Sequence, residues 1–413
     1  MKKEKVPELR FPEFDESFLN TTLGKISKFS KGKGVSKSDV SEDGTECIRY
    51  GELYTKYGEL IDETVSNTNL NLDELVLSEE DDLIIPASGE TAVDIATASC
   101  VKRKGIALGG DINIIKCDQD STFLAYYLNG KKKTNIARYA QGSSVIHLYS
   151  TQLKLLKLNL PTKPEQQKIA SFLSAVDTKI EQLTRKKELL EEYKKGVMQK
   201  LFPKAGEQHP ELRFKDEHGE DFPDWEVKRL GRICEMTSSK RVYLSDYVEE
   251  GIPFYRGKEI SELRMNQTPS DILYIKKDKY FEFKAKYGVP KKNDILVTAV
   301  GTLGNVFRIR NNDPFYFKDG NLIWFRKIKE NSIFLEILLQ WYNRILLKTS
   351  IGSTQKALTM VELRKLKFSF PSTLEQNKIS EFLEELDQKI EFIDSRIGKT
   401  KTFKKGLLQK MFV

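Results

Sequence analysis

The segments PTKPEQQKIASFL (residues 161–173) and PSTLEQNKISEFL (residues 371–383) occur once in each half of the chain and decide its fold. Matched residues lie 210 positions apart. The same offset continues through DTKIE at 177–181 and DQKIE at 387–391, and through KKGVMQKLF at 194–202 and KKGLLQKMF at 404–412. An ungapped match over about forty residues is not chance, and it indicates an internal repeat.

Apolar residues recur in the repeated segments at steps that alternate between four and three. A narrow stripe on otherwise charged segments predicts two helices of about 36 residues, roughly 54 Å long, that pair as a coiled coil. The predicted seam consists of Ile169, Leu173, Val176, Ile180, Leu183, Leu190 and Val197 in the first helix and Ile379, Leu383, Leu386, Ile390, Ile393, Ile397 and Leu407 in the second. Lys187 also falls on the stripe, where its stem can lie along the other helix while its charge reaches water. The spacing allows a parallel or an antiparallel pair, and we favour the antiparallel one, which gives the repeat a pseudo-twofold axis.

Before each helix the repeat persists only loosely. PELRF occurs at 7–11 and again at 210–214, but the offset upstream of the helices drifts between 203 and 212. Two modules that share a scaffold and differ in their loops explain this drift. The sequence therefore predicts an α+β protein, with two modules of mixed α/β type separated by the long helices. The predicted parts are residues 1–160 (first module), 161–203 (first helix), 204–217 (linker), 218–370 (second module) and 371–413 (second helix).

Short apolar runs bounded by Gly, Asp or Asn predict short strands inside the modules. The clearest runs lie at 83–85, 112–115, 295–297 and 322–325. One short helix is expected in each module, near Thr122–Leu128 and Ile333–Asn343. These elements suit two compact cores that carry variable loops.

Composition excludes several classes of protein. The formal net charge is +8, a mild basic bias that is compatible with a nucleic-acid partner. The four cysteines form no CxxC pair and the chain has three histidines, so no zinc-ligand spacing exists and no metal site is expected. The sequence begins without an apolar leader and has no apolar run of about 18 residues. We therefore expect a cytoplasmic protein without a membrane span.

Three groups of loop residues recur at equivalent places in both modules and carry side chains that contact phosphates and base edges. The first group lies at 31–38 and 238–241, the second at 49–52 and 255–258, and the third at 138–144 and 352–356. The candidate contact residues are Lys31, Lys33, Ser36, Lys37, Arg49, Tyr50, Glu52, Arg138, Gln141, Ser143 and Ser144 in the first module and Lys240, Arg241, Tyr255, Arg256, Lys258, Ser353, Thr354, Gln355 and Lys356 in the second. Arginine is the preferred bidentate partner of guanine, and a carboxylate such as Glu52 can accept from cytosine. For any single residue, a solvated surface charge or a turn remains an equally good interpretation.

The opening PELRFPEF (residues 7–14) and the closing helix with its EQ-x-KI-x-x-FL and D-x-KIE motifs, present twice, resemble the type I restriction enzyme specificity subunit. The resemblance covers essentially the whole chain. It implies two target-recognition domains that each read one half of a bipartite, asymmetric site in double-stranded DNA. It also implies that the paired helices set the unread spacer, and a pseudo-twofold arrangement suits a duplex. The implied partners are two methyltransferase subunits and the motor–nuclease subunits. S-adenosylmethionine, ATP and Mg²⁺ are expected on these partners, and no cofactor on this chain.

The chain is not expected to be catalytic by itself. The Asn/Asp-Pro-Pro-Tyr/Phe signature of adenine methyltransferases is absent, as are helicase motifs and a GxxxxGK[ST] phosphate loop. Glu226-Val-Lys228 resembles the ExK of metal-dependent nucleases, but the start of a strand explains it better. We expect the chain to direct the DNA adenine methyltransferase and endonuclease activities of a complex. The alternative is a coiled-coil adaptor that binds only proteins.

Overall fold

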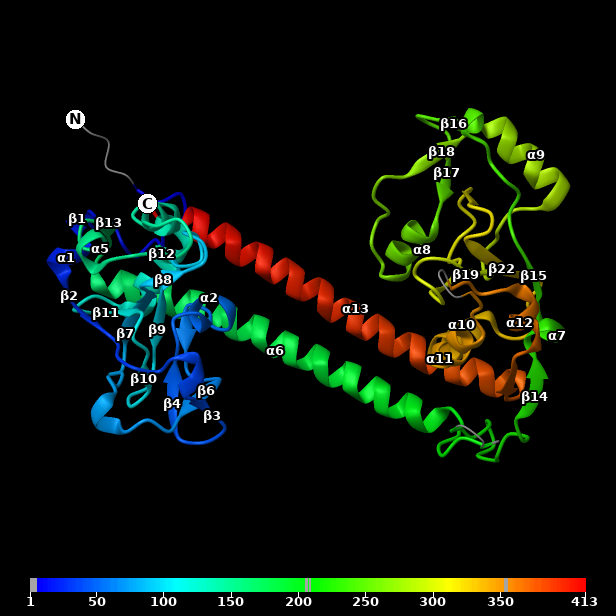
Figure 1. Ribbon diagram of the computed structural model, residues 1–413, viewed down its shortest axis with the longest axis horizontal. Coiled ribbons are helices and arrows are strands. Elements are labelled where there is room, and N and C mark those ends of the chain that lie inside the picture. The colour runs from blue at the N-terminus through cyan, green and yellow to red at the C-terminus, as the bar shows by residue number, and fades with distance from the viewer. Residues whose placement is uncertain (1–5, 205–206, 208, 353–355) are drawn as a thin grey trace. The chain divides into compact units, whose positions relative to one another are not determined.

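The computed structural model describes residues 6–204, 207, 209–352 and 356–413 (Figure 1). The chain divides into two compact units. The first unit takes the described residues up to Lys187 together with Phe392–Val413, and the second takes Glu188–Glu391. Each unit therefore contains one module and a part of both long helices.

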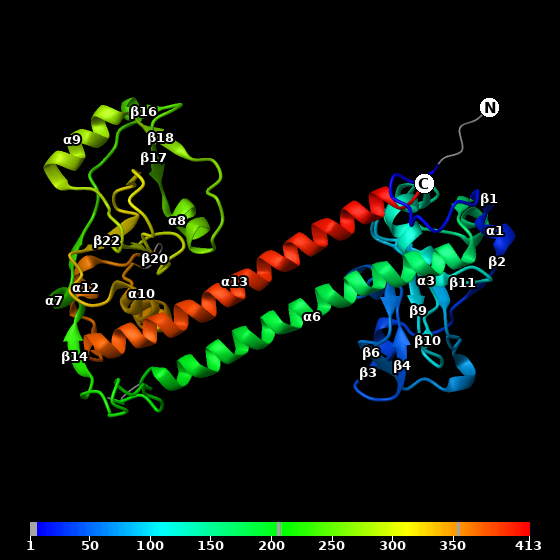
Figure 2. The same cartoon turned by 180° about the vertical axis from the view of Figure 1, so that it is seen from behind.

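The long helices are α6 (Lys163–Leu201, 39 residues) and α13 (Thr373–Lys410, 38 residues). Within each unit they lie side by side and run in opposite directions (Figure 2). In the first unit, Lys404 Nζ lies 2.8 Å from Asp177 Oδ1, and Lys187 Nζ lies 2.5 Å from Asp394 Oδ1. A step forward along α6 thus matches an equal step back along α13, and the antiparallel prediction is confirmed.

The predicted stripe faces the inside of this pair. Its residues are buried or half-buried without exception. The stem of Lys187 is also half-buried, with its amine on the carboxylate of the opposite helix. In the second unit, Lys194 Nζ meets Asp387 Oδ1 at 2.5 Å, which is the repeat equivalent of the Lys404–Asp177 pair.

The repeated EQ dipeptide explains why both helices begin where they do. The side chains of Gln166 and Gln376 are fully buried, and each donates from Nε2 to the carbonyl of a preceding proline at 2.9 Å, Pro161 and Pro371 respectively. Backbone carbonyls in front of a helix need such donors when they are buried. The same bond in both halves gives both helices the same start.

Two connected sheets build the first module. The five-stranded sheet has the order β2-β11-β7-β9-β5 and the four-stranded sheet has the order β10-β4-β6-β3, while β1 pairs with β13 and β8 with β12. The strands are β1 (Leu19–Thr22), β2 (Ser27–Lys31), β3 (Val40–Ser41), β4 (Thr45–Ile48), β5 (Leu60–Ile61), β6 (Ser66–Thr68), β7 (Asp82–Pro86), β8 (Ser88–Gly89), β9 (Ser99–Val101), β10 (Ala107–Leu108), β11 (Ile112–Cys117), β12 (Ile146–His147) and β13 (Lys157–Leu160). The helices are α1 (Leu23–Ile26), α2 (Glu52–Thr55), α3 (Ser121–Tyr127), α4 (Lys133–Ala137) and α5 (Ser150–Leu153), with short turns η1 (Lys37–Asp39), η2 (Leu72–Glu74) and η3 (Leu128–Lys132).

The second module repeats this plan. The order β16-β18-β17-β21 matches β3-β6-β4-β10, including one parallel pair in each sheet, and β15-β22-β19-β20 forms the other sheet. The strands are β14 (Glu226–Arg229), β15 (Glu235–Thr237), β16 (Tyr247–Val248), β17 (Ile252–Tyr255), β18 (Leu273–Ile275), β19 (Ile295–Thr298), β20 (Val306–Arg308), β21 (Tyr316–Phe317), β22 (Leu322–Arg326) and β23 (Lys367–Phe370). The helices are α7 (Leu230–Ile233), α8 (Gly257–Arg264), α9 (Lys277–Tyr287), α10 (Ser332–Trp341), α11 (Asn343–Lys348) and α12 (Met360–Lys365), with turn η4 (Leu244–Asp246).

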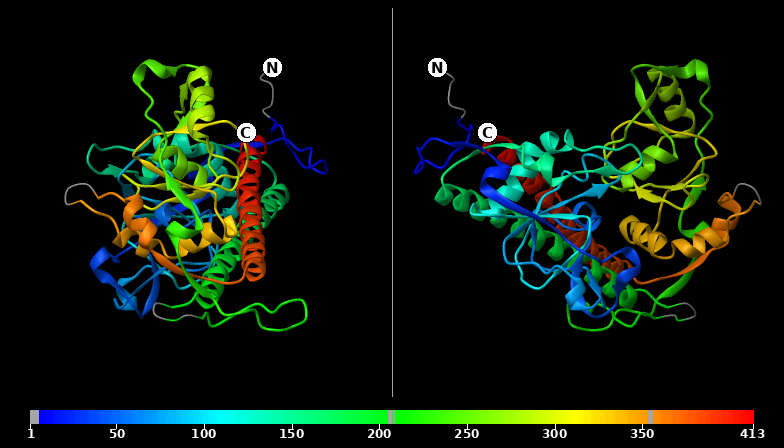
Figure 3. Two further views of the ribbon diagram at one scale, coloured as in Figure 1. Left: turned by 90° about the vertical axis from the view of Figure 1, so that its right-hand side faces the viewer. Right: turned by 60° about the vertical axis from the view of Figure 1, so that its left-hand side comes forward.

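The long helices complete the core of each module. In the first unit the C-terminal end of α13, drawn in red, lies against the first module (Figure 3). Leu407, Met411 and Phe412 there pack into the cluster that contains α3 and the start of α6. In the second unit, Leu201 and Phe202 at the end of α6 take the corresponding place among α10 and the start of α13. None of the described helices has the length and hydrophobicity that a membrane span requires.

Candidate nucleic-acid interface

The first candidate loop of the first module follows β2 and is held close to the neighbouring chain. Gly32 N donates to Ile112 O at 3.0 Å and Lys33 N to Leu108 O at 2.9 Å. A Cβ at Gly32 would lie only 2.1 Å from Gly109 O, so only glycine fits this approach. Lys31, Lys33, Ser36 and Lys37 are all exposed on this fixed backbone. The Ser36 hydroxyl and amide bond Asp39 and lower the pKa of that carboxyl.

The equivalent loop of the second module follows β15. Lys240 and Arg241 are exposed there. The backbone amide of Lys240 donates to the Tyr316 hydroxyl at 2.8 Å, and Arg241 Nε lies 3.3 Å from Asp319 Oδ2. Both side chains are therefore available at a surface whose backbone is held in place.

The arginines of the second group have a structural partner that was not foreseen. Arg49 donates from Nη2 to Glu52 Oε1 at 2.6 Å, while its backbone amide donates to Glu52 Oε2 at 2.9 Å. Arg256 holds Glu259 in the same way, with its amide 2.6 Å from Oε2. Glu259 lies in the first turn of α8 and accepts from the amide of the N-cap residue Arg256, whereas Glu52 is the first residue of α2 and accepts from Arg49, just before that helix. Glu259 also raises the pKa of Arg256. The signal was an Arg-x-x-Glu spacing in both modules.

This arrangement limits what the second group can offer to a ligand. Glu52 is 5% exposed and also accepts from Ser66, so its carboxylate oxygens are already engaged. Arg49 and Arg256 remain half-buried with part of each guanidinium uncommitted. Tyr50 and Lys258 are exposed, whereas the ring of Tyr255 stacks on Phe315 with centroids 5.0 Å apart.

In both modules an antiparallel backbone pair closes the third group, and we call these paired ends its hairpin. Gln141 and His147 exchange backbone bonds of 2.9 and 2.7 Å, and Ile351 and Ala357 do the same at 2.9 and 2.8 Å. Arg138, Gln141, Ser143 and Ser144 are exposed at the first hairpin. In the second hairpin Lys356 is exposed, and Ser353, Thr354 and Gln355 lie outside the described residues.

In the first unit a chain of backbone contacts links the segments that carry the three groups. Gly109 N donates to Ile48 O, directly before Arg49, and the neighbouring Gly110 N donates to Gly34 O, so the first two groups share this glycine pair. The third group joins through β12, which pairs with β8. A Cβ at Gly89 of β8 would lie 3.5 Å from the Tyr54 hydroxyl of α2, the helix that Arg49 and Glu52 begin. The structure thus brings together loops that are far apart in the sequence.

In the second unit β21 joins the first two groups. Tyr316 accepts from Lys240, and Lys318 N donates to Tyr255 O at 2.9 Å. The hairpin of the third group is attached by Leu358 N, which donates to Ala299 O at 2.9 Å. The two candidate surfaces therefore have the same construction and different side chains.

The contacts that fix each module on the long helices join residues far apart in the sequence, and no local pattern predicts them. In the first unit Lys404 Nζ contacts Glu59 Oε2 at 2.9 Å as well as Asp177, and it lies 5.2 Å from the Tyr126 ring centroid. Tyr126 donates to Asp177 at 2.6 Å. Burial alone would lower the pKa of Lys404, but the two carboxylates raise it.

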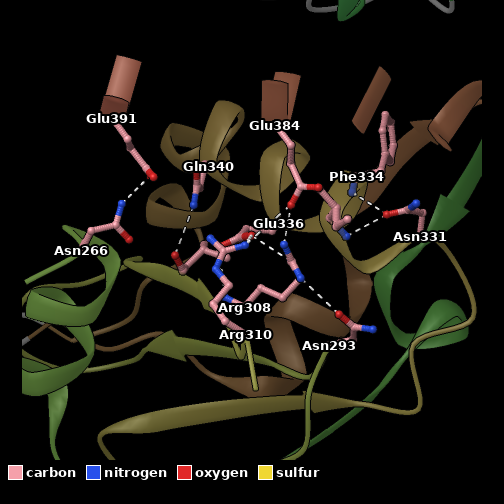
Figure 4. A network of polar contacts seen from close by, with 12 residues as sticks. Asn266, Asn293, Arg308, Arg310, Asn331, Phe334, Glu336, Gln340, Glu384 and Glu391 are labelled. Atoms are coloured by element: carbon pink, nitrogen blue, oxygen red, sulfur yellow. Dashed lines mark hydrogen bonds and ion pairs between the residues drawn. The ribbon is translucent and has the colours of Figure 1, made fainter. Parts of the chain in front are cut away.

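In the second unit a different network of polar contacts fixes the module on the long helices (Figure 4). Arg308 of β20 donates to Glu336 of α10 at 3.2 Å from Nε and at 3.0 Å from its backbone amide. Its Nη2 donates to Glu384 of α13 at 2.6 Å and its Nη1 to Asn293 at 3.1 Å. Arg310 adds a second cation at Glu336. One buried arginine thus joins the sheet, α10 and the long helix.

The PELRF segments, whose structural role could not be predicted from the sequence, form further contacts with the long helices. Arg10 donates from Nε and Nη2 to Glu165 at 2.8 Å each, and Arg213 donates likewise to Glu375 at 3.0 and 2.7 Å. In the same segments Leu9 N donates to Lys410 O, and Leu212 N to Lys200 O, at 2.9 Å. Each segment ties the start of one long helix to the end of the other.

No group of three or more histidine, cysteine or carboxylate side chains in the described part of the chain could hold a metal ion.

Comparison with known proteins agrees with this architecture. The model of the type I restriction modification DNA specificity domain matches residues 16–192 and 223–399. The specificity subunit of the type I restriction enzyme MjaVIII from Methanocaldococcus jannaschii is 26% identical over 404 residues, covering 94% of this chain and 91% of that protein. The putative type I restriction enzyme MjaX specificity subunit of the same organism is 32% identical over 280 residues, covering 65% and 62%.

Solved structures share the fold along nearly the whole chain. The S subunit of a type I restriction–modification system from M. genitalium aligns with a TM-score of 0.63 at 17% identity, covering 99% of both chains. A chain from a study of complex assembly and conformational transition of the type I R-M system aligns with a TM-score of 0.56 at 16% identity, covering 97% of this chain and 98% of that one.

Proposed function

The chain belongs to the family of type I restriction–modification specificity subunits, and from this premise we propose that it reads a bipartite, asymmetric site in double-stranded DNA. Each module reads one half-site with the three loop groups described above. The observation that carries the proposal is their common construction. In both modules corresponding strands hold the corresponding loops, while the exposed side chains of the described loop residues differ, as two readers of different sequences require.

The long helices supply the second part of the proposal. They set the length of DNA between the half-sites and dock two methyltransferase subunits, and the motor–nuclease subunits then join. The chain itself carries out no reaction and directs adenine methylation and cleavage by these partners. S-adenosylmethionine, ATP and Mg²⁺ belong to the partner subunits. A cytoplasmic location follows from this role.

The test begins with the site itself. Methylome sequencing of cells with and without the gene should reveal one bipartite adenine-methylated motif that disappears on deletion. The chain in complex with its methyltransferase subunits should then bind that motif more tightly than a scrambled duplex, with an affinity that falls as salt rises. A complex that assembles but shows neither sequence preference nor salt dependence would mean that the chain is a protein-binding adaptor.

Modular reading has a sharper test. Residues 16–158 are exchanged for the first module of another specificity subunit, and the methylome is sequenced again. One half of the motif should change while the other half and the spacer length stay as they were. A change in both halves would contradict the assignment of one half-site to each module.

A further inference from the structure

One connection of the fold carries opposite charge in the two modules. It joins β6 to β7 in the first module and β18 to β19 in the second, which are equivalent strands of matching sheets. Residues 69–81 contain five acidic residues and no lysine or arginine. Residues 276–294 contain seven lysines against three acidic residues. The surplus of positive charge therefore belongs to the second module alone.

In the second module this connection folds as helix α9. Tyr280 and Phe283 bury its inner face, and Phe283 lies against Tyr316 with ring centroids 5.0 Å apart. Gly288, with φ at +78°, follows the helix, a conformation that favours glycine. The helix is thus fixed on the sheet, and its outer face is held in a defined position.

The outer face combines cations with an exposed ring. Phe281 is 56% exposed, and Lys284 Nζ lies 6.0 Å from its centroid. Lys279 and Lys286 share the carboxylate of Glu282 at 3.2 and 3.1 Å. Within the described chain, Lys277 and Lys284 have no acidic partner.

This face continues into the candidate interface of the same unit. Lys240 Nζ lies 4.8 Å from the ring centroid of Tyr287, the last residue of α9. At the other end, Lys276 Nζ donates to Ser245 O at 2.8 Å and holds η4, where Leu244 is 89% exposed. We name the surface made by Lys240, Leu244, Lys277, Phe281, Lys284 and Tyr287 the α9 face.

We propose that the α9 face grips the sugar–phosphate backbone of double-stranded DNA beside the half-site that the second module reads. The inference rests on the proposed function and adds a contact that is independent of the base sequence of the DNA. Lysines neutralise phosphates without base preference. A duplex that reaches Lys240 also reaches Tyr287, because the two side chains touch. The first module, acidic at the same connection, has no such grip.

The test uses the complex with methyltransferase subunits and compares Lys277→Gln/Lys284→Gln with Lys329→Gln/Lys367→Gln. The control lysines are also exposed but belong to the β14–β23 end of the second module. Loss of two phosphate contacts should lower the slope of log K against log salt by about 1.8, so the ratio of wild-type to variant affinity falls about tenfold between 50 and 200 mM salt. The preference for the methylated motif should not change. Thermal unfolding should show that both variants are folded.

An unchanged salt slope would overturn the proposal, as would normal DNA binding with loss of a methyltransferase subunit, which would make the α9 face a protein-docking surface. Neutral methylphosphonates supply a second measurement. In the second half-site they should abolish the difference between wild type and variant, and in the first half-site they should not. The slope is measurable on any duplex. A wild-type complex without sequence preference therefore contradicts the proposed function alone, and a variant that equals wild type contradicts the α9 grip alone.

Discussion

Arg308 Nη2 donates to the carboxylate of Glu384 at 2.6 Å, and this bond joins the second module to α13. Arg308 is 5% exposed and Glu336, its other carboxylate partner, is 4% exposed. Burial lowers the pKa of Arg308, and the carboxylates oppose that effect. A buried charge that is balanced in this way costs much to disturb, because removing one partner leaves the others unpaired.

Arg308→Met should lower the free energy of unfolding of the second unit by about 3–5 kcal/mol. Arg310→Met is the matched control and should cost less than about 1 kcal/mol, because Arg310 is 52% exposed at the same carboxylate. Urea denaturation followed by tryptophan fluorescence measures both, since the three tryptophans, Trp225, Trp324 and Trp341, all lie in this unit. Equal costs for the two variants would contradict the role assigned to the buried network.

Lys404→Met should destabilise the first unit more than Lys194→Met destabilises the second, by about 1–2 kcal/mol. The two lysines are repeat equivalents, but Lys404 contacts Glu59 as well as Asp177, whereas Lys194 pairs only with Asp387 among the described residues. Hydrogen exchange of α3 and of α10 reports the two units separately. If Lys194→Met proves the more costly, the contact with Glu59 does not anchor the module.

Loss of a PELRF contact should destabilise only the unit that contains it. Arg213→Ala leaves Glu375 buried without a partner, at a cost of about 3–5 kcal/mol, and should lower the urea midpoint seen by tryptophan fluorescence. Arg10→Ala leaves Glu165 in the same situation in the unit without tryptophan. It should accelerate hydrogen exchange at the start of α6 while the tryptophan transition stays in place. Arg213→Met/Glu375→Leu is the control, because replacing both charges should recover most of the loss.

A matched deletion tests the spacer. Removing residues 187–193 and 388–394 takes seven residues from each long helix, keeps the apolar stripe in phase and respects the register of the ion pairs Lys187–Asp394 and Lys194–Asp387. Each helix shortens by about 10 Å, which is the rise of about three base pairs. Methylome sequencing should show the same two half-sites with a correspondingly shorter spacer. An unaltered spacer would mean that the long helices do not set the distance between the half-sites.

Local signals account for what could be predicted about the fold. The seven-residue period predicted the ends of α6 and α13 to within two or three residues. This was possible because the spacing of apolar residues along a helix can be read from the sequence of that helix alone. The short helices near residues 122 and 333 also appear, as α3 and α10, but the expectation of one short helix in each module was wrong, because the described chain contains further helices in both modules, among them α8. Helix α9 was missed, because seven lysines in its connection hide the apolar pair Tyr280 and Phe283.

The candidate interface could be predicted only in part from the sequence. Repetition predicted which loops correspond, but the partner of a charged side chain depends on the folded chain. Arg49 and Arg256 looked like free readers of bases, whereas each holds a carboxylate three residues away. The contacts of Arg308 with Glu384 and of Lys404 with Glu59 join residues far apart in the sequence, and no local pattern announces them.

The place of Leu407, Met411 and Phe412 in the core of the first module has a consequence for synthesis on the ribosome. Residues 188–391 form one uninterrupted unit, whereas the first unit needs residues from 392 onward. At 5–20 residues per second, those residues are made about 10–40 s after Lys187. The first module is therefore translated first but completes its hydrophobic core last. Until the end of α13 has been synthesised, the apolar residues of the nascent first module that pack on it stay exposed, while the second unit can already fold.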